Sequence, residues 1–266
     1  MMELFKGSAP EQRAKRAVEV AKAGAAIIDK LLLVGGAVPI LGNVCTTARE
    51  IFRNVEQVAR KVGDVLEMGE RVLEALRLLE RMGKNIEMFP VTDELRDGWQ
   101  SLRDVLWLIL DSVETFGRKG WVKRVLNASM KLGSMVALDQ RLGKELEALL
   151  RLYKMERDGA LLEAAAKART YPFETALVTQ VQVHLQAHGG TQEAAVAALA
   201  ANDKALQELA QQLSVDHGEL RDEIREYHIE VSARPTGAAP CQSPFSTSRV
   251  CAPCAPPGDV QARCAR

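Results

Sequence analysis

Apolar residues recur at helical spacing in the stretch from Pro90 to Tyr153, the most informative part of the chain. In its first half they follow one another at alternating steps of four and three: Leu95, Trp99, Leu102, Leu106, Ile109, Val113 and Phe116. A second run of the same kind closes the stretch: Leu138, Leu142, Leu146, Leu149 and Tyr153. Because such steps place side chains on one face of a helix, the pattern predicts two amphipathic helices.

A basic segment, residues 118–131, separates the two apolar runs and is itself predicted to be helical. It combines an aromatic residue with a cluster of cations: Arg118, Lys119, Trp121, Lys123, Arg124 and Lys131. Cations near a membrane surface attract anionic lipid headgroups, and a tryptophan can lie at the interface. We therefore expect these residues to bind lipid. The alternative is a solvated helix face whose charges pair with the acidic C-terminal helices.

The N-terminal part is predicted to form a helix over residues 10–33, with Pro10 in its first turn. The uncharged stretch LLLVGGAVPILGNVCTTA follows, and its length reaches the lower limit for a membrane span. Glycines and a proline interrupt it, which favours a hinge leading into a core helix. The alternative is a segment that enters a bilayer after activation, with the candidate residues Leu31, Leu32, Leu33, Val34, Ile40 and Leu41.

Leucines recur every seven residues in the C-terminal region, at Leu199, Leu206, Leu213 and Leu220. This spacing is a weak signal of a coiled coil or helix hairpin, and it makes these leucines candidates for binding partner helices. Residues 232–266 are instead rich in Pro, Ala, Ser and Cys, a composition typical of disorder. Their pair Cys251 and Cys254 has the spacing of a metal knuckle, but a single pair is a weak signal, so incidental thiols are favoured.

The composition narrows the class of protein. Aromatic residues make up 5% of the chain, which favours helices over sheets. The chain has 35 acidic and 35 basic side chains, a balance that speaks against a nucleic-acid partner. The N-terminus lacks the apolar core of a secretion signal, and the cysteines do not resemble a secreted disulfide framework. We therefore expect an intracellular protein.

Signatures of catalysis are missing from the sequence. Phosphate-binding glycine loops, a kinase catalytic loop and a nucleophile-elbow motif do not occur. His184 and His188 have the spacing of a metal-binding pair on a helix, but no Glu or Cys lies nearby to complete a ligand set. We therefore expect a non-enzymatic protein with no metal and no cofactor.

Two blocks of the sequence carry a family resemblance. The first, EQVARKVGDVLEMGERV, contains Met68, Gly69, Arg71 and Val72. The second, residues 102–150, contains the landmarks Glu114-Thr115-Phe116, Gly120-Trp121-Val122-Lys123 and Leu138-Asp139-Gln140-Arg141-Leu142. These blocks resemble the N-terminal four-helix bundle of the mixed-lineage-kinase-domain-like proteins and the plant Mid1-complementing-activity proteins. Both belong to the wider group of Cbl-N-terminal-like and HeLo-like adaptor bundles.

The resemblance implies an all-α fold, namely an antiparallel four-helix bundle with a brace helix and accessory C-terminal helices. The implied helices lie at about 38–60, 64–82, 92–117 and 120–135, with a brace from about 137. It places a chain reversal near Lys61–Asp64, which periodicity alone leaves open. The expected parts are an N-terminal helix and hinge (1–36), the bundle with its brace (37–155), an accessory helical region (156–231) and the tail (232–266).

Bundles of this family act as signalling adaptors and, in several branches, as executioners of cell death that permeabilise membranes. The resemblance thus implies a protein that oligomerises and engages anionic membrane through the basic segment. It would be cytoplasmic, peripherally associated with the plasma membrane, and switched in trans by a kinase or receptor-type partner. The alternative is a soluble adaptor or scaffold in cell-surface receptor or calcium signalling, which binds partner helices without membrane insertion.

Overall fold

The computed structural model describes residues 10–34, 39–88, 92–118, 120–122, 126, 134–155, 158–188, 191–213 and 215–232. Every described residue belongs to one compact unit, which spans residues 1–233. Across these described ranges every regular element is a helix. The expected all-α class is therefore confirmed.

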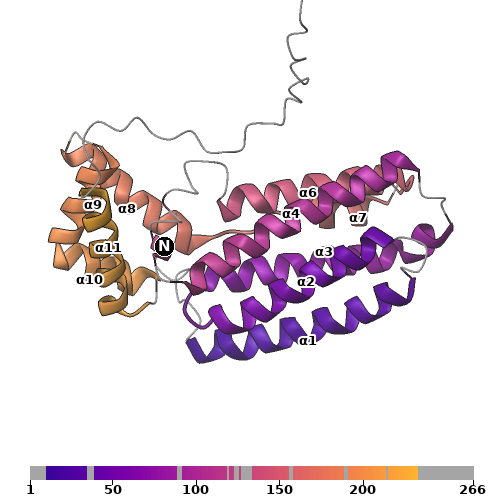
Figure 1. Cartoon of the computed structure of the whole chain (residues 1–266), viewed down its shortest axis with the longest axis horizontal. Coiled ribbons are helices and arrows are strands. Elements are labelled where there is room, and N and C mark those ends of the chain that lie inside the picture. The colour runs from indigo at the N-terminus through magenta and orange to yellow at the C-terminus, as the bar shows by residue number, and fades with distance from the viewer. Residues whose placement is uncertain are drawn as a thin grey trace, which may run out of the picture. The chain divides into compact units, whose positions relative to one another are not determined.

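The first five helices described are long and lie lengthwise beside one another (Figure 1): α1 (Pro10–Val34), α2 (Pro39–Val58), α3 (Gly63–Met88), α4 (Asp93–Gly117) and α6 (Met135–Leu152). Local sequence explains where they begin. Pro10 opens α1, where its missing N–H costs no helical hydrogen bond. Thr92 caps α4 by accepting a hydrogen bond from Leu95 N at 3.2 Å. Ser134 caps α6 in the same way, so both helix starts are set by local chemistry.

The long apolar periodicity that begins in α2 covers two helices rather than one. α2 ends at Val58, whose carbonyl accepts hydrogen bonds from Lys61 N (2.9 Å) and Val62 N (3.2 Å). Beyond this turn α3 packs so closely on α2 that a Cβ at Gly69 would lie 2.8 Å from Val55 Cγ1. The break between the helices lies where the family resemblance implied one.

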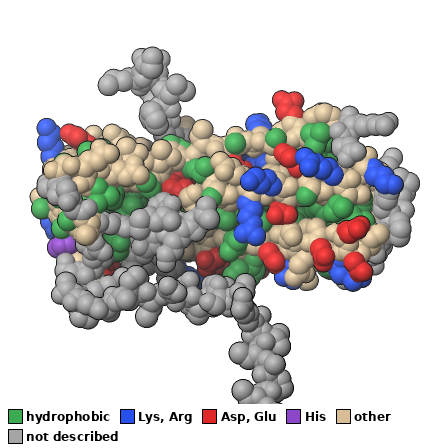
Figure 2. Space-filling model, turned by 90° about the horizontal axis from the view of Figure 1, so that it is seen from above, with side chains coloured by type: hydrophobic (Ala, Val, Ile, Leu, Met, Phe, Trp, Pro, Cys, Tyr) green, Lys and Arg blue, Asp and Glu red, His purple; other side chains and the backbone are tan. Residues whose placement is uncertain are grey.

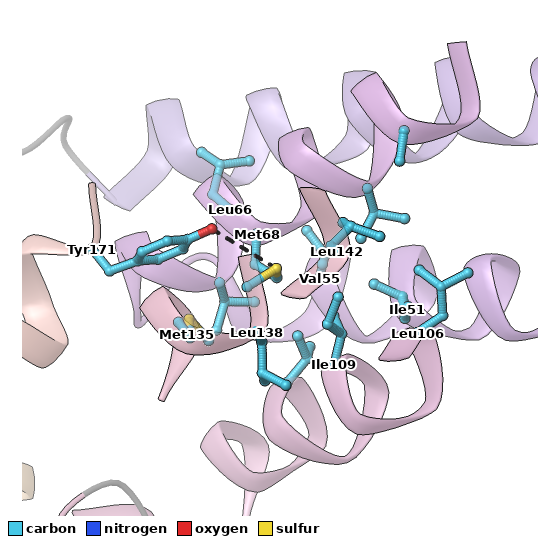
Figure 3. Close-up of a cluster of buried hydrophobic side chains, with 14 of the residues drawn as sticks. Ile51, Val55, Leu66, Met68, Leu106, Ile109, Met135, Leu138, Leu142 and Tyr171 are labelled. Carbon is cyan, nitrogen blue, oxygen red and sulfur yellow. Dashed lines mark hydrogen bonds between the residues drawn. The ribbon is translucent and has the colours of Figure 1, made fainter. Parts of the chain in front are cut away.

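The predicted apolar face of α4 lies in the core, since all seven of its residues are buried. This face contacts α2 and α6. Figure 3 shows Leu106 and Ile109 of α4 in one cluster with Ile51 and Val55 of α2. Burial of each such side chain contributes about 1.5–3 kcal/mol. The prediction of this face from spacing is therefore confirmed.

The N-terminal helix shares this core. α1 packs along α2 and α3, and its residues Ile28 and Leu31 are buried. Phe52 of α2 occupies the space beside Gly24, where a Cβ would lie 2.2 Å from the ring. Only a glycine permits this approach without displacing Phe52. Close packing thus joins α1 to the helices expected to form the bundle.

Shorter helices occupy most of the described chain after α6: α7 (Gly159–Ala166), α8 (Pro172–His188), α9 (Gln192–Ala201), α10 (Asp203–Leu213) and α11 (His217–Ser232). α8 contacts α9 and α10, and α9 contacts α11. Thr191 caps α9 by accepting a hydrogen bond from Ala194 N at 3.4 Å. These helices therefore pack on one another, while α7 packs on α6 and α3.

Candidate functional site: a buried charge network

Arg71 of α3 is the centre of a buried charge network. Its guanidinium is 1% exposed and pairs with Asp139 of α6, which is 2% exposed. It also donates to the backbone carbonyls of Ala164 (3.0 Å) and Ala165 (2.6 Å) near the end of α7. A Cβ at Gly143 would lie 2.8 Å from Ala165 O, so the glycine lets α6 and α7 approach. One side chain thus joins α3, α6 and α7.

Arg169 extends the network from the segment that follows α7. Its backbone N–H donates to Asp139 Oδ2 at 2.7 Å. Its guanidinium bonds to three carboxylates of α3, at 2.7 Å from Glu67, 2.7 Å from Glu70 and 2.8 Å from Glu74. Burial alone would lower the pKa of Arg169, but the bonds to Glu74, Glu67 and Glu70 outweigh it and raise the pKa. Arg169 therefore stays charged, and its ion pairs hold the segment after α7 against α3.

Two buried carboxylates cap helices other than their own. Asp64 of α3 accepts hydrogen bonds from Phe173 N (3.0 Å) and Glu174 N (2.8 Å) at the start of α8. Glu174 in turn accepts from Met135 N (2.9 Å) at the start of α6. Each carboxylate meets backbone N–H groups that a helix start leaves without an internal partner. Burial raises the pKa of Asp64 to about 7, against the effect of these bonds, and it also raises the pKa of Glu174.

A third carboxylate links α11 to the start of the basic segment. Glu223 accepts a hydrogen bond from Gly120 N at 3.1 Å, and burial raises its pKa. Gly120 adopts φ +78°, a conformation that favours glycine. The acidic C-terminal helices therefore contact this segment, although here through a backbone N–H rather than through a cation.

The residues predicted to bind lipid are only partly described. Arg118 and Trp121 are described, and Lys119, Lys123, Arg124 and Lys131 lie outside the described residues. Arg118, which follows α4, donates from Nη2 to Glu114 Oε2 of that helix at 2.7 Å. Trp121 is 5% exposed, and its ring centroid lies 5.3 Å from that of Phe173. Because it is packed in the core, Trp121 offers no side-chain surface to a lipid headgroup in this structure.

The membrane-insertion candidates divide into buried and exposed residues. Leu31 and Leu41 are buried, Ile40 is half-buried, and the side chain of Val34 lies outside the described residues. Leu32 is 42% exposed and Leu33 is 87% exposed at the end of α1. Within the ranges that the structure describes, none of the helices combines the length and apolar character needed to cross a membrane.

The leucines predicted to bind partner helices are buried in contacts between helices of this chain. The four side chains are between 0% and 5% exposed: Leu199, Leu206, Leu213 and Leu220. They belong to the mutually packed helices α9, α10 and α11. Contact with an external helix through these leucines would require the C-terminal helices to separate.

The candidate metal ligands lie largely beyond what the structure describes. The tail cysteines fall outside the described residues, as do the side chains of His184 and His188. Among the residues that are described, no three His, Cys, Asp or Glu side chains are grouped as a metal would require. Cys45 is buried, and burial raises the pKa of its thiol to about 11.

The sequence patterns did not predict the buried network, although the sequence contains one signal of it. Arg71 and Asp139 both interrupt otherwise apolar helix faces, and both lie within the landmarks that carry the family resemblance. A charged residue inside an apolar stripe must find a partner, because an unpaired buried charge is very unfavourable. The spacing could not identify that partner, which lies 68 positions away.

The network positions helices relative to one another. Its carboxylates and guanidinium groups are bonded to one another or to backbone groups, and it holds α7 and α8 against α3 and α6. Figure 2 shows that basic and acidic side chains are interspersed on the visible described surface. Comparison of the chain with protein-family models, with curated proteins and with solved structures finds no match.

Proposed function

We propose that this chain is a non-enzymatic helical adaptor whose copies associate through α4. The observation that carries the proposal is Trp107, which is 59% exposed on a helix whose opposite face is buried in the core. Its neighbour Leu108 is 38% exposed. Tryptophan is enriched among the residues that dominate protein interfaces, and a rigid helix presents it at little entropic cost.

The scaffold in this proposal is the antiparallel four-helix bundle with a brace of the mixed-lineage-kinase-domain-like type. Three of its implied helices, 38–60, 64–82 and 92–117, agree with the bounds of α2, α3 and α4 within six residues or fewer. α6 begins two residues before the implied brace. The pairing of Arg71 with Asp139 joins two of the landmark motifs. A kinase or receptor-type partner would supply the signal in trans.

The charges on α4 favour a second copy of this chain as the partner. If two α4 helices cross antiparallel with Trp107 on the two-fold axis, Arg103 of each copy faces Asp111 of the other. Within its own copy Arg103 also pairs with Asp104, at 2.6 Å. Arg96 then faces Arg118, but each already pairs with an acid of α4, at 2.9 Å and 2.7 Å. The exposed face is therefore largely self-complementary, as an isologous interface requires.

Sedimentation equilibrium over a range of protein concentrations tests the proposal. We expect the wild type to associate and Trp107→Asp to remain monomeric. Val183→Asp, at an exposed apolar position of α8 (52%), is the matched control and should leave association unchanged. Trp107 is the only exposed tryptophan of the three, so acrylamide quenching of fluorescence should fall as copies associate. A monomeric wild type at all concentrations, or equal effects of the two variants, would refute the proposal.

A second candidate function, engagement of anionic membrane, is favoured by the exposure of Leu32 and Leu33 at the end of α1. An apolar pair at a helix end can enter the headgroup region of a bilayer. We expect the protein to sediment with vesicles containing phosphatidylserine and Leu33→Asp to sediment less. Val183→Asp, which replaces another exposed apolar side chain (52%), should have no effect. Equal sedimentation with neutral and anionic vesicles would count against this candidate.

A further inference from the structure

A small pocket of about 180 Å³ lies between α3 and the end of α7. Its lining combines three cations, one carboxylate and two apolar side chains: Arg77, Arg81, Lys167, Glu74, Leu78 and Ala164. Typical pockets for drug-sized ligands measure roughly 300–1,000 Å³. This pocket is smaller, so it fits a compact charged group with a few attached atoms.

The cations of the pocket are poorly compensated. Arg77 and Arg81 lie one turn apart on α3, both exposed, and within the described part of the chain neither has an ion pair. Lys167 follows α7, is 63% exposed, and lies 3.8 Å from Glu74. Two guanidinium groups on one rigid helix can each offer paired donors to an oxyanion.

The buried network partly compensates the negative groups nearby. Glu74 Oε1 accepts from Arg169 Nη2 at 2.8 Å. The carbonyls of Ala164 and Ala165, which would repel an anion at the end of α7, accept hydrogen bonds from Arg71. Arg77 and Arg81 are therefore the positive groups that an anion in the pocket would meet.

One acceptor beside the cations lacks a donor. Glu74 Oε2 is buried and, among the described residues, has no hydrogen-bond partner. Arg71 Nη1 lies 3.9 Å from this oxygen. Because this oxygen is buried, a ligand in the pocket would meet the cations and not this acceptor.

We propose that this pocket binds the phosphate monoester of a small soluble molecule. A phosphate monoester carries nearly two negative charges at pH 7 and three strong acceptor oxygens, which suit a lining that contains three cations. The size of the pocket admits the phosphate and its first attached atoms. The site lies on α3 and α7 and does not depend on self-association through α4.

Isothermal titration calorimetry with glycerol phosphate as the probe tests the proposal on the full chain. We expect saturable binding at pH 7.5 that weakens at pH 5, where the second phosphate oxygen is protonated, since its pKa is about 6. Arg77→Gln and Arg81→Gln should each weaken binding at least about tenfold, the loss of one charge-assisted contact. Arg53→Gln, an exposed arginine of α2, is the control and should leave binding unchanged. Circular dichroism should confirm that all variants are folded.

Vesicles distinguish the two sources of a phosphate monoester. A soluble ligand is supported if the protein binds glycerol phosphate and also binds phosphatidic acid vesicles no better than phosphatidylglycerol vesicles. Binding to phosphatidic acid vesicles alone would overturn that choice and assign the pocket to a lipid headgroup. Absence of binding to both probes, or binding that survives Arg77→Gln and Arg81→Gln, would overturn the site itself.

Discussion

Replacing Arg71 by methionine would leave Asp139 buried without its cation. The methionine side chain fills much of the space that the aliphatic part of arginine occupies, so the main loss is electrostatic. Both members of the pair are almost fully buried, at 1% and 2% exposed. Removing one partner of such a pair typically costs about 3–5 kcal/mol, because the remaining charge is uncompensated. The carbonyls of Ala164 and Ala165 also lose their donors, which adds to the loss.

A double-mutant cycle measured by urea unfolding isolates this interaction. We expect Arg71→Met to lower the free energy of unfolding by about 3–5 kcal/mol. In Arg71→Met with Asp139→Asn the buried charge is gone, while the amide oxygen can still accept from Arg169 N. The double variant should therefore be less destabilised than the sum of the single ones, with a coupling of about 0.5–3 kcal/mol. Far-ultraviolet circular dichroism follows the transition.

A surface pair provides the control for this cycle. Arg96 and Asp93 are 58% and 91% exposed, and such pairs contribute about 0–1 kcal/mol. Arg96→Met should therefore change stability little. Hydrogen exchange gives a second readout, since α7 should lose protection when Arg71 no longer holds its last carbonyls. Equal costs for Arg71→Met and Arg96→Met, or additive single effects, would refute the reasoning.

Two further perturbations follow from the same contacts. Burial raises the pKa of Asp64 from 3.8 to about 7, so the native state holds a proton that the unfolded chain releases between these values. This contribution to stability is complete below pH 3.8 and is lost as pH rises through about 7. Thermal unfolding from pH 4 to 8 should show this decline, and Asp64→Asn should flatten it; identical profiles would contradict the assignment. Gly143→Ala should cost about 1–3 kcal/mol, because its Cβ would lie 2.8 Å from Ala165 O. Gly42→Ala meets nothing within 4 Å in α2 and should instead stabilise by up to about 1 kcal/mol. Urea unfolding compares the two, and equal effects would show that the close approach is unimportant.

Helix faces could be predicted because they depend on local spacing. The run from Leu95 to Phe116 repeats every three or four residues, and an α-helix converts that repeat directly into one buried face. The break between α2 and α3 could not be predicted in this way. When the chain reverses direction between two helices, both can keep their apolar faces toward the same core. The apolar periodicity therefore continues through the turn.

The candidate site was harder to predict from the sequence. Spacing shows which side chains share a helix face, but it does not show what covers that face. Trp121 stands in a basic segment, yet Phe173 packs on it from the start of α8. Leu199 and Leu206 have the spacing of a partner-binding seam, yet the chain's own helices cover them. In both cases the covering element is remote in sequence.

The sequence alone determined the helical class and the apolar faces, since both follow from propensity and from contacts within a few turns. Only the tertiary structure decided which charges are buried and with what they pair. Arg71 and Asp139 lie 68 positions apart, and their meeting depends on how α3, α6 and α7 stack. The physical reason is that a buried charge is stabilised by groups gathered from several helices, and no local pattern encodes that gathering.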